Sequence, residues 1–292
     1  MLRVQAIGWA LQLVCLAMMA TNVQSLQFNS DPPIGNITII PRTKDWPRPV
    51  TLPHDKHPSP TKNIFAFHGT DNLEVARTIL RTNLIISDIA GDFNPGRANV
   101  ISGAGGAAYL ADSLMASAQF VCYSKNSPTK ITHAHIVRFE LEGAGAKVYR
   151  FQEKDETWQF FVYCNLEPGC LSHYKNSQNA DDKRWYAWVE ETFKNHIIEG
   201  FMDGADDEKL TPNFWQYAII KPDFLKDKLK PVAVYESIPC NKVPQTTSLK
   251  DTDYLAGQYT NPEAFDALLM VLGVKQSQTS LSQSPSSRGN SQ

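Results

Sequence analysis

Three short segments of the chain carry side chains that can bind and orient a polar ligand. Phe67–Thr70 (FHGT) contains an imidazole and a glycine, and Gly105–Asp112 (GGAAYLAD) leads through a tyrosine toward Ser117 and Phe120. The third segment, Phe214–Ile220 (FWQYAII), is an aromatic run with one amide side chain. A His-Gly pair is usually a turn, and paired glycines often mark a bulge. No segment identifies a function alone, so their order and spacing must carry the information.

In order, separation and internal spacing, the segments resemble the His-Tyr-Glu class of ADP-ribosyltransferases, which includes the catalytic domain of poly-ADP-ribose polymerases and diphtheria-type toxins. The first segment of that family is His-Gly-Ser/Thr, and residues 68–70 read HGT. The second is Gly-x-Tyr-x-Ala-Asp, with a serine eight residues beyond the tyrosine and an aromatic residue three further on. Tyr109, Ser117 and Phe120 stand at those offsets. The resemblance covers about residues 63–220.

The resemblance implies that the chain binds NAD without a metal. Tyr109 and Phe120 would stack on the flat nicotinamide cation, because aromatic faces attract cations. The Gly69 backbone, which no side chain shields, and the Ser117 hydroxyl would hold the carboxamide. His68 would hydrogen-bond a ribose hydroxyl and orient the sugar. The implied NAD-binding residues are His68, Gly69, Thr70, Tyr109, Ser117 and Phe120.

Gln216 departs from the family pattern, because the third segment of active members has a glutamate at this position. That glutamate contacts the ribose 2′-hydroxyl and stabilises the positive charge that develops as the glycosidic bond breaks. Glutamine keeps the hydrogen-bonding reach but not the charge, and losing one such electrostatic partner costs about 10²–10³ in rate. We therefore expect no polymer formation. The implied catalytic residues are His68, Tyr109 and Gln216.

Three functions stay open at this point. The chain could transfer one ADP-ribose unit to a protein or other target, hydrolyse NAD as a glycohydrolase, or bind NAD or a protein partner through an inactive pocket. Another acid could substitute for the missing glutamate, and the candidates are Glu208, Glu190 and Glu191. Glutamates are normally exposed, so a solvated surface is the simpler interpretation of all three.

Other constellations are weaker. His133 and His135 alternate on a predicted strand and share a face, but two histidines without a third ligand are thin evidence for zinc. Asp203, Asp206 and Asp207 form an acidic cluster that lacks the EF-hand pattern, so a solvated loop is simpler than a calcium site. The absence of nucleophile-elbow, P-loop and Gly-x-Gly-x-x-Gly motifs disfavours hydrolase, P-loop and Rossmann functions.

Residues 1–25 have the features of a secretory signal peptide. Arg3 precedes an apolar run at Ile7–Met19, and compact residues follow at Val23–Ser25. The formal charge of −2 disfavours a broad electrostatic contact with nucleic acid, and no later segment is apolar enough to predict a membrane span. We expect a secreted, extracellular protein. NAD is scarce outside cells, so a secreted transferase suggests a toxin or effector that acts inside another cell.

The rest of the chain divides by composition. Residues 26–60 form a proline-rich, extended arm that contains a predicted N-glycosylation acceptor, Asn36. Residues 61–240 are expected to form a single ADP-ribosyltransferase-like domain. Residues 241–274 are an extension with a short helix, and the Ser/Gln-rich residues 275–292 are predicted to be disordered.

Apolar spacing predicts an α+β fold with a mixed or antiparallel sheet, and the resemblance implies split sheets with flanking helices. Strands are predicted at residues 63–68, 107–111, 133–141, 214–220 and 231–237. Helices are predicted at residues 71–81, 113–123, 183–196 and 262–272, with N-caps at Thr70/Asp71 and Asp112 and a stop at Gly273.

Four cysteines remain beyond the predicted signal peptide: Cys122, Cys164, Cys170 and Cys240. An even number in an oxidising compartment favours two disulfides, for which three connectivities exist. Cys164 and Cys170 bracket a turn-rich loop that a local disulfide could close.

Overall fold

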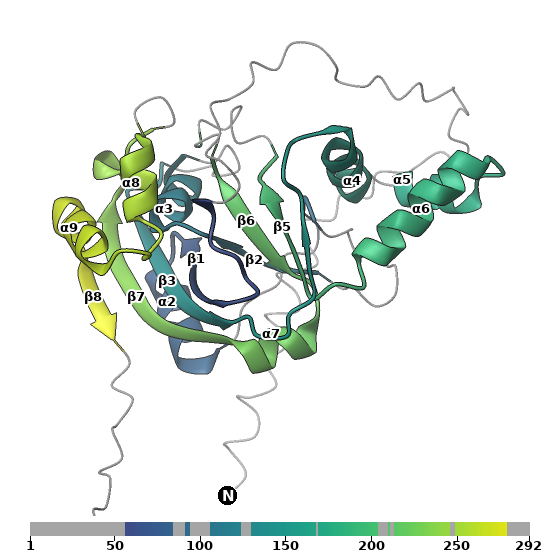
Figure 1. Cartoon of the computed structure of the whole chain (residues 1–292). Coiled ribbons are helices and arrows are strands. Elements are labelled where there is room, and N and C mark those ends of the chain that lie inside the picture. Colours follow the sequence, from purple (N-terminus) through teal and green to yellow (C-terminus); the bar gives the residue numbers. More distant parts are fainter. Residues whose placement is uncertain are drawn as a thin grey trace, which may run out of the picture. The chain divides into compact units, whose positions relative to one another are not determined.

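In the computed structural model, the described residues belong to one compact unit. The structure describes residues 56–83, 91–93, 106–123, 130–167, 169–203, 210, 213–245 and 249–278. As predicted, the fold is α+β, with a mixed eight-stranded sheet flanked by helices (Figure 1). The predicted signal peptide, Asn36 and most of the proline-rich arm lie outside the described residues.

The elements follow one another along the chain without a regular alternation of strand and helix. The strands are β1 (Asn63–Thr70), β2 (Ala108–Ala111), β3 (His133–Glu142), β4 (Val148–Arg150), β5 (Ile197–Phe201), β6 (Trp215–Ile219), β7 (Leu229–Pro239) and β8 (Lys275–Gln278). The helices are α2 (Leu73–Thr82), α3 (Leu114–Tyr123), α4 (Glu156–Leu166), α5 (Cys170–Asn176), α6 (Ala180–Thr192), α7 (Pro222–Lys228), α8 (Asp251–Ala256), α9 (Pro262–Leu272) and the 3₁₀ helix η3 (Cys240–Lys242).

The sheet is split between β1 and β2. Its order is β4-β5-β6-β2-β1-β3-β7-β8, with β4 and β5 parallel and the other neighbours antiparallel. Only the pair Phe67–Ala111 joins β1 to β2 among the described residues, whereas all eight residues of β1 pair with β3. Two four-stranded halves therefore meet at one residue pair, in agreement with the split sheets that were expected.

Each half of the sheet is packed against its own helices. In Figure 1, α8 and α9 lie on the flank of β7 and β8, and α4, α5 and α6 lie on the opposite flank. In the core beside α9, Phe67 and Phe265 stack with ring centroids 5.9 Å apart. In the core beside α4, Phe93 and Phe161 belong to one aromatic cluster. A further core, which contains Ala66 of β1 and Tyr217 of β6, spans both halves of the sheet.

Both ends of the described chain join this unit. His57, in the predicted arm, stacks on Trp215 and bonds Asp112 at 2.7 Å. Tyr254 of α8 donates a hydrogen bond to Asp112 Oδ1, and Gln258 donates to Asp112 Oδ2, the oxygen that His57 contacts, at 2.7 Å. The end of the arm and the C-terminal extension are therefore packed against the core of the predicted domain.

Several predicted boundaries move. The helix predicted at 71–81 is α2, which begins later because the Asn72 side chain accepts from Glu74 N and Val75 N. The third predicted helix is α6, displaced toward the N-terminus because residues after Phe193 lead into β5. Helix α9 has the predicted bounds, and Gly273 ends it with a left-handed φ of 68°. Lys275–Gln278 form a strand where a disordered tail was predicted.

Elements without a clear periodic pattern were not predicted. They are β4, β5, α4, α5, α7 and α8. All five residues of β5 (IIEGF) are buried, so no alternation marks the strand. Helix α4 buries Trp158, Phe161 and Cys164, and its apolar residues are spread too widely for one stripe.

The four cysteines form two disulfides, Cys122–Cys240 and Cys164–Cys170. The second is the local bridge that the spacing suggested, and the first links α3 to η3. Within the part of the chain that the structure describes, no helix has the length and apolar character needed to cross a membrane.

Candidate functional site

His68 lies at the split, one residue beyond the pair that joins the two halves of the sheet. Its Nδ1 is 3.1 Å from the backbone oxygen of Tyr109 on β2. A carbonyl oxygen only accepts, so Nδ1 carries a proton and is the donor in this contact. The first two residues predicted for the site are therefore in contact, across the split.

Gly69 follows His68 on β1, at a position where β1 is not paired with β2 among the described residues. A Cβ on Gly69 would lie 2.6 Å from Val121 Cγ2 and 2.7 Å from the backbone oxygen of Ser117. Helix α3 thus packs directly on the Gly69 main chain, and only glycine fits this contact.

Helix α3 brings Ser117 to the same place. The Ser117 hydroxyl is buried and donates to the backbone oxygen of Phe67 at 3.2 Å. Phe120, one turn later, is 38% exposed, and among the described residues its ring partner is Phe214 rather than Tyr109. Thr70 accepts a hydrogen bond from Asn72 N and so shapes the turn into α2. Ser117 lies beside Gly69, whereas Phe120, which was expected to stack on the nicotinamide together with Tyr109, packs against Phe214.

Tyr109 and Gln216 share one face of the sheet. Tyr109 pairs with Ala218, and Ala111 pairs with Gln216. Paired residues project to the same side and side chains alternate along a strand, so Tyr109 and Gln216 are diagonal neighbours, about 7–8 Å apart. The three residues expected to be catalytic come from three adjacent strands, β1, β2 and β6. Phe67 pairs with Ala111, so it projects to this same face. The alternation therefore projects His68 to the opposite face from Tyr109 and Gln216, and the described contact of its ring is with the Tyr109 backbone oxygen.

A short segment, Gly91–Phe93, lies against both of these side chains. Phe93 N donates to the Tyr109 hydroxyl at 2.9 Å. A Cβ on Gly91 would lie 2.6 Å from that hydroxyl oxygen, so glycine is needed for the close approach. The Phe93 ring is fully buried against Phe151, with centroids 5.6 Å apart. The segment is fixed at its aromatic end.

Asp92, in the middle of this segment, contacts Gln216 directly. Gln216 Nε2 donates to Asp92 Oδ2 at 2.5 Å, and Asp203 N donates to the same oxygen at 2.7 Å. The second Gln216 contact is with the backbone oxygen of Phe201, at 3.5 Å. Asn165 of α4 donates to the Asp92 backbone oxygen at 2.9 Å. A carboxyl group therefore stands beside the position where the family has its glutamate.

Burial is the main reason why the pKa of Asp92 rises from 3.8 to about 7. The hydrogen bonds from Asp203 N and Gln216, and the positive charge of Lys154, lower the pKa, while the carboxylate of Asp203 raises it. Near neutral pH this group is close to half ionised.

Sequence reasoning did not find Asp92. It lies in the stretch between α2 and β2, and neither its spacing from Gln216 nor a local pattern marks it. The flanking Gly91 and Phe93 become informative only when their contacts with Tyr109 are known.

Of the acids that were predicted as substitutes, the two that the structure describes, Glu190 and Glu191, do not occupy this position. Glu190 and Glu191 are exposed on α6, and Glu191 pairs with Lys194. Glu208 lies outside the described residues, as do Asp206 and Asp207 of the acidic cluster.

His133 and His135 are not brought together as a metal site. A bulge interrupts their strand at Ala134/Ile136, leaving His133 exposed and His135 buried. His135 Nδ1 accepts from Ser237 N at 3.0 Å, and desolvation lowers the pKa of His135. Among the described residues, no three metal-ligating side chains cluster.

A second polar cluster lies on the opposite face of β5 and β6. Glu199 is buried, and its carboxylate accepts from Arg150 Nε at 2.6 Å and from Trp215 Nε1 at 3.2 Å. Desolvation raises the pKa of Glu199, although Arg150 opposes that shift. Glu199 pairs with Tyr217 in the register, so it points away from Gln216.

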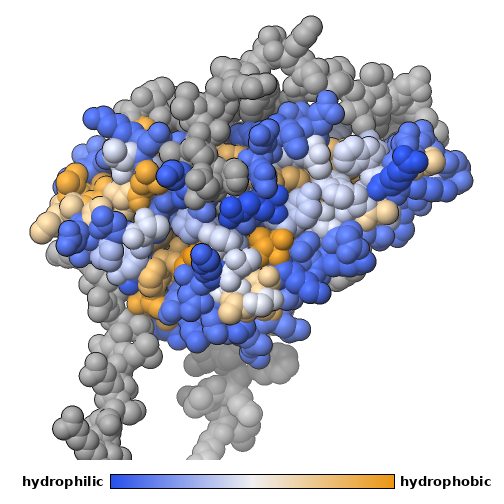
Figure 2. Space-filling view, in the orientation of Figure 1, coloured by the Kyte–Doolittle hydropathy of each residue, from blue (hydrophilic) through white to orange (hydrophobic). Residues whose placement is uncertain are grey.

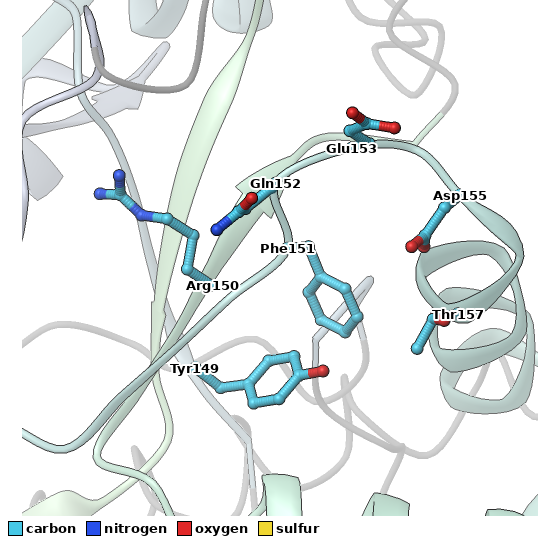
Figure 3. A pocket seen from close by; sticks show the side chains of 7 residues that line it. All are labelled: Tyr149, Arg150, Phe151, Gln152, Glu153, Asp155 and Thr157. Atoms are coloured by element: carbon cyan, nitrogen blue, oxygen red, sulfur yellow. The ribbon is translucent and has the colours of Figure 1, made fainter.

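Figure 3 shows a pocket of about 250 Å³ beside this cluster. It is lined by Tyr149, Arg150, Phe151, Gln152, Glu153, Asp155 and Thr157. Arg150 points away from the rings of Tyr149 and Phe151 (Figure 3), toward its partner Glu199. None of the residues expected to be catalytic lines this pocket.

No protein-family model, curated protein or solved structure matches this chain.

Proposed function

We propose that this protein binds NAD at the split of the sheet and transfers ADP-ribose from it to a protein or other acceptor, releasing nicotinamide. The observation that supports the proposal is that His68, Tyr109 and Gln216 lie on three adjacent strands, β1, β2 and β6, with His68 Nδ1 donating to the Tyr109 backbone oxygen across the split. Three segments that are far apart in the sequence, and that together resemble one family, are therefore neighbours in the sheet.

The surrounding contacts suit the parts of NAD. At Gly69, β1 is not paired with β2 among the described residues. Main-chain peptide groups on that side of β1 can hydrogen-bond a carboxamide. Ser117, beside it, adds a hydroxyl, and Tyr109 offers a ring for the nicotinamide cation. With Nδ1 donating to Tyr109, the Nε2 side of His68 suits a ribose hydroxyl.

The test is incubation of the purified full chain with labelled NAD, with and without a cell lysate. We expect nicotinamide release and label on protein, and we expect both to fall in Tyr109→Ala and His68→Ala. Thr78→Ala, an exposed change on α2 outside the site, is the control and should behave like wild type.

The products distinguish the functions. If the label is found in free ADP-ribose and not on protein, the protein is an NAD glycohydrolase and not a transferase. Binding of NAD without nicotinamide release, in both wild type and Gln216→Glu, would contradict an enzyme and leave a binding module.

A further inference from the structure

We propose that the Asp92 carboxylate supplies the negative charge that Gln216 cannot supply, so that the two side chains together do the work of the single glutamate in the resembled family. This inference rests on the proposed function. Its basis is the 2.5 Å contact between Gln216 Nε2 and Asp92 Oδ2, on the face of the sheet that also carries Tyr109.

Hydrogen bonds with three different elements hold the segment that contains Asp92 in place. Phe93 N bonds the Tyr109 hydroxyl, Asn165 bonds the Asp92 backbone oxygen, and Asp203 N bonds the carboxylate. These contacts come from β2, α4 and the end of β5. Preorganised charges act without reorganisation during the reaction, which is what makes electrostatic stabilisation effective.

A structural role alone does not explain a carboxylate here. The two hydrogen bonds to Oδ2 need only an acceptor, and an asparagine amide oxygen would accept both. Burying a charge costs free energy that an amide would not cost. Asp92 nevertheless stands half-buried beside Gln216, with Lys154 as the cation that lowers its pKa.

The transfer needs no reactant besides NAD and the acceptor nucleophile or water. The bond between ribose C1′ and the nicotinamide nitrogen breaks, and its electron pair goes to the nitrogen, which leaves as neutral nicotinamide. The positive charge that develops on the ribose lies near the Asp92 carboxylate, which is not consumed. A nucleophile from the acceptor, or water, then bonds C1′ with its own electron pair and loses its proton to solvent.

The charge of Asp92 must control the rate if this is its role. The groups that face it are Gln216 on β6, Asp203 at the end of β5, and Lys154 before α4. Nicotinamide release should therefore rise with pH through an apparent pKa near 7 and level off above it.

The deciding experiment compares Asp92→Asn, the charge-relocated pair Asp92→Asn/Gln216→Glu, and the control Asp203→Asn. Asp203→Asn removes a neighbouring charge of the same sign but leaves the Asp92 carboxylate beside Gln216. Because the Asp203 carboxylate raises the pKa of Asp92, this variant should keep the rate at high pH and move the rising limb to lower pH. Nicotinamide release is measured across pH, with NAD binding and thermal unfolding measured on the same samples. We expect Asp92→Asn to lose about 10²–10³ in rate. The double variant should recover most of that loss.

The outcomes distinguish a failure of the proposed role of Asp92 from a failure of the proposed transferase function. Release that survives in Asp92→Asn, or a loss that the double variant does not recover, overturns the role of Asp92 and leaves the transferase standing. Wild type without any release overturns both. If Asp92→Asn does not fold, the wild-type profile decides alone, and a flat rate from acid to neutral pH overturns the inference.

Discussion

At the scale of single residues, the site depends on a pair of side chains rather than on one. Gln216 is buried and donates both of its described hydrogen bonds to protein acceptors, one of them Asp92. Sequence alone could identify Gln216, because a family pattern puts a glutamate there. It could not identify Asp92, because the contact joins residues that are 124 positions apart.

The raised pKa of Asp92 predicts a pH-dependent stability. The folded protein holds this proton up to a pH near 7, whereas the unfolded chain loses it near 3.8. The resulting stabilisation is complete below the unfolded pKa and is lost as the pH rises through the folded pKa. Denaturant unfolding should therefore show wild type losing stability across this window relative to Asp92→Asn. Parallel curves for the two proteins would contradict the burial of this carboxyl.

At the scale of the elements, β1 and α3 position the site through a contact that has no room for a side chain. Predicted strands and helices with clear spacing, such as β3 and α9, were found close to their true bounds. Helix α4 and β5 were missed because burial on several sides removes the period that a sequence can show. The segments bearing His68, Tyr109 and Gln216 were predicted, but α4 and β5, two of the elements that hold Asp92 beside Gln216, were not.

Gly69→Ala tests the contact between β1 and α3. The new methyl group would meet Val121 and the Ser117 backbone, so we expect a stability loss of about 1–3 kcal/mol. Nicotinamide release should fall further than stability, because β1 would move away from α3 at the site. The control is Asn72→Ala, which removes the α2 cap and costs about 0.5–2 kcal/mol. Equal loss of activity in both variants would argue against a specific role for this contact.

At the scale of the whole molecule, two disulfides of very different span stabilise the unit. Cys122–Cys240 closes a separation of 118 residues, and Cys164–Cys170 closes one of 6. The long bridge links α3, which carries Ser117, to the segment that follows β7. Near the end of α9, Met270 and Val271 are 81% and 73% exposed. Figure 2 shows hydrophobic residues on the surface at the side of the molecule where Figure 1 places α8 and α9.

Replacing each pair by serine should have unequal effects. In the chain-entropy account, the long loop contributes about 4–5 kcal/mol and the short one about 2 kcal/mol. Chemical denaturation of Cys122→Ser/Cys240→Ser and Cys164→Ser/Cys170→Ser, each against wild type, measures both. A larger loss from the short bridge would show that native packing, rather than the denatured chain, sets their contributions.

The carboxylate of Asp112 ties together parts of the chain that the motifs do not include. His57 reaches it from the N-terminal side, Tyr254 and Gln258 reach it from the C-terminal side, and Asp112 itself directly follows β2. A recombinant fragment cut to the motif-bearing span of 61–240 would strip this buried anion of all three partners. Expression boundaries should therefore be drawn outside residues 56 and 258, since the smallest autonomous folding unit is larger than the stretch that carries the chemistry.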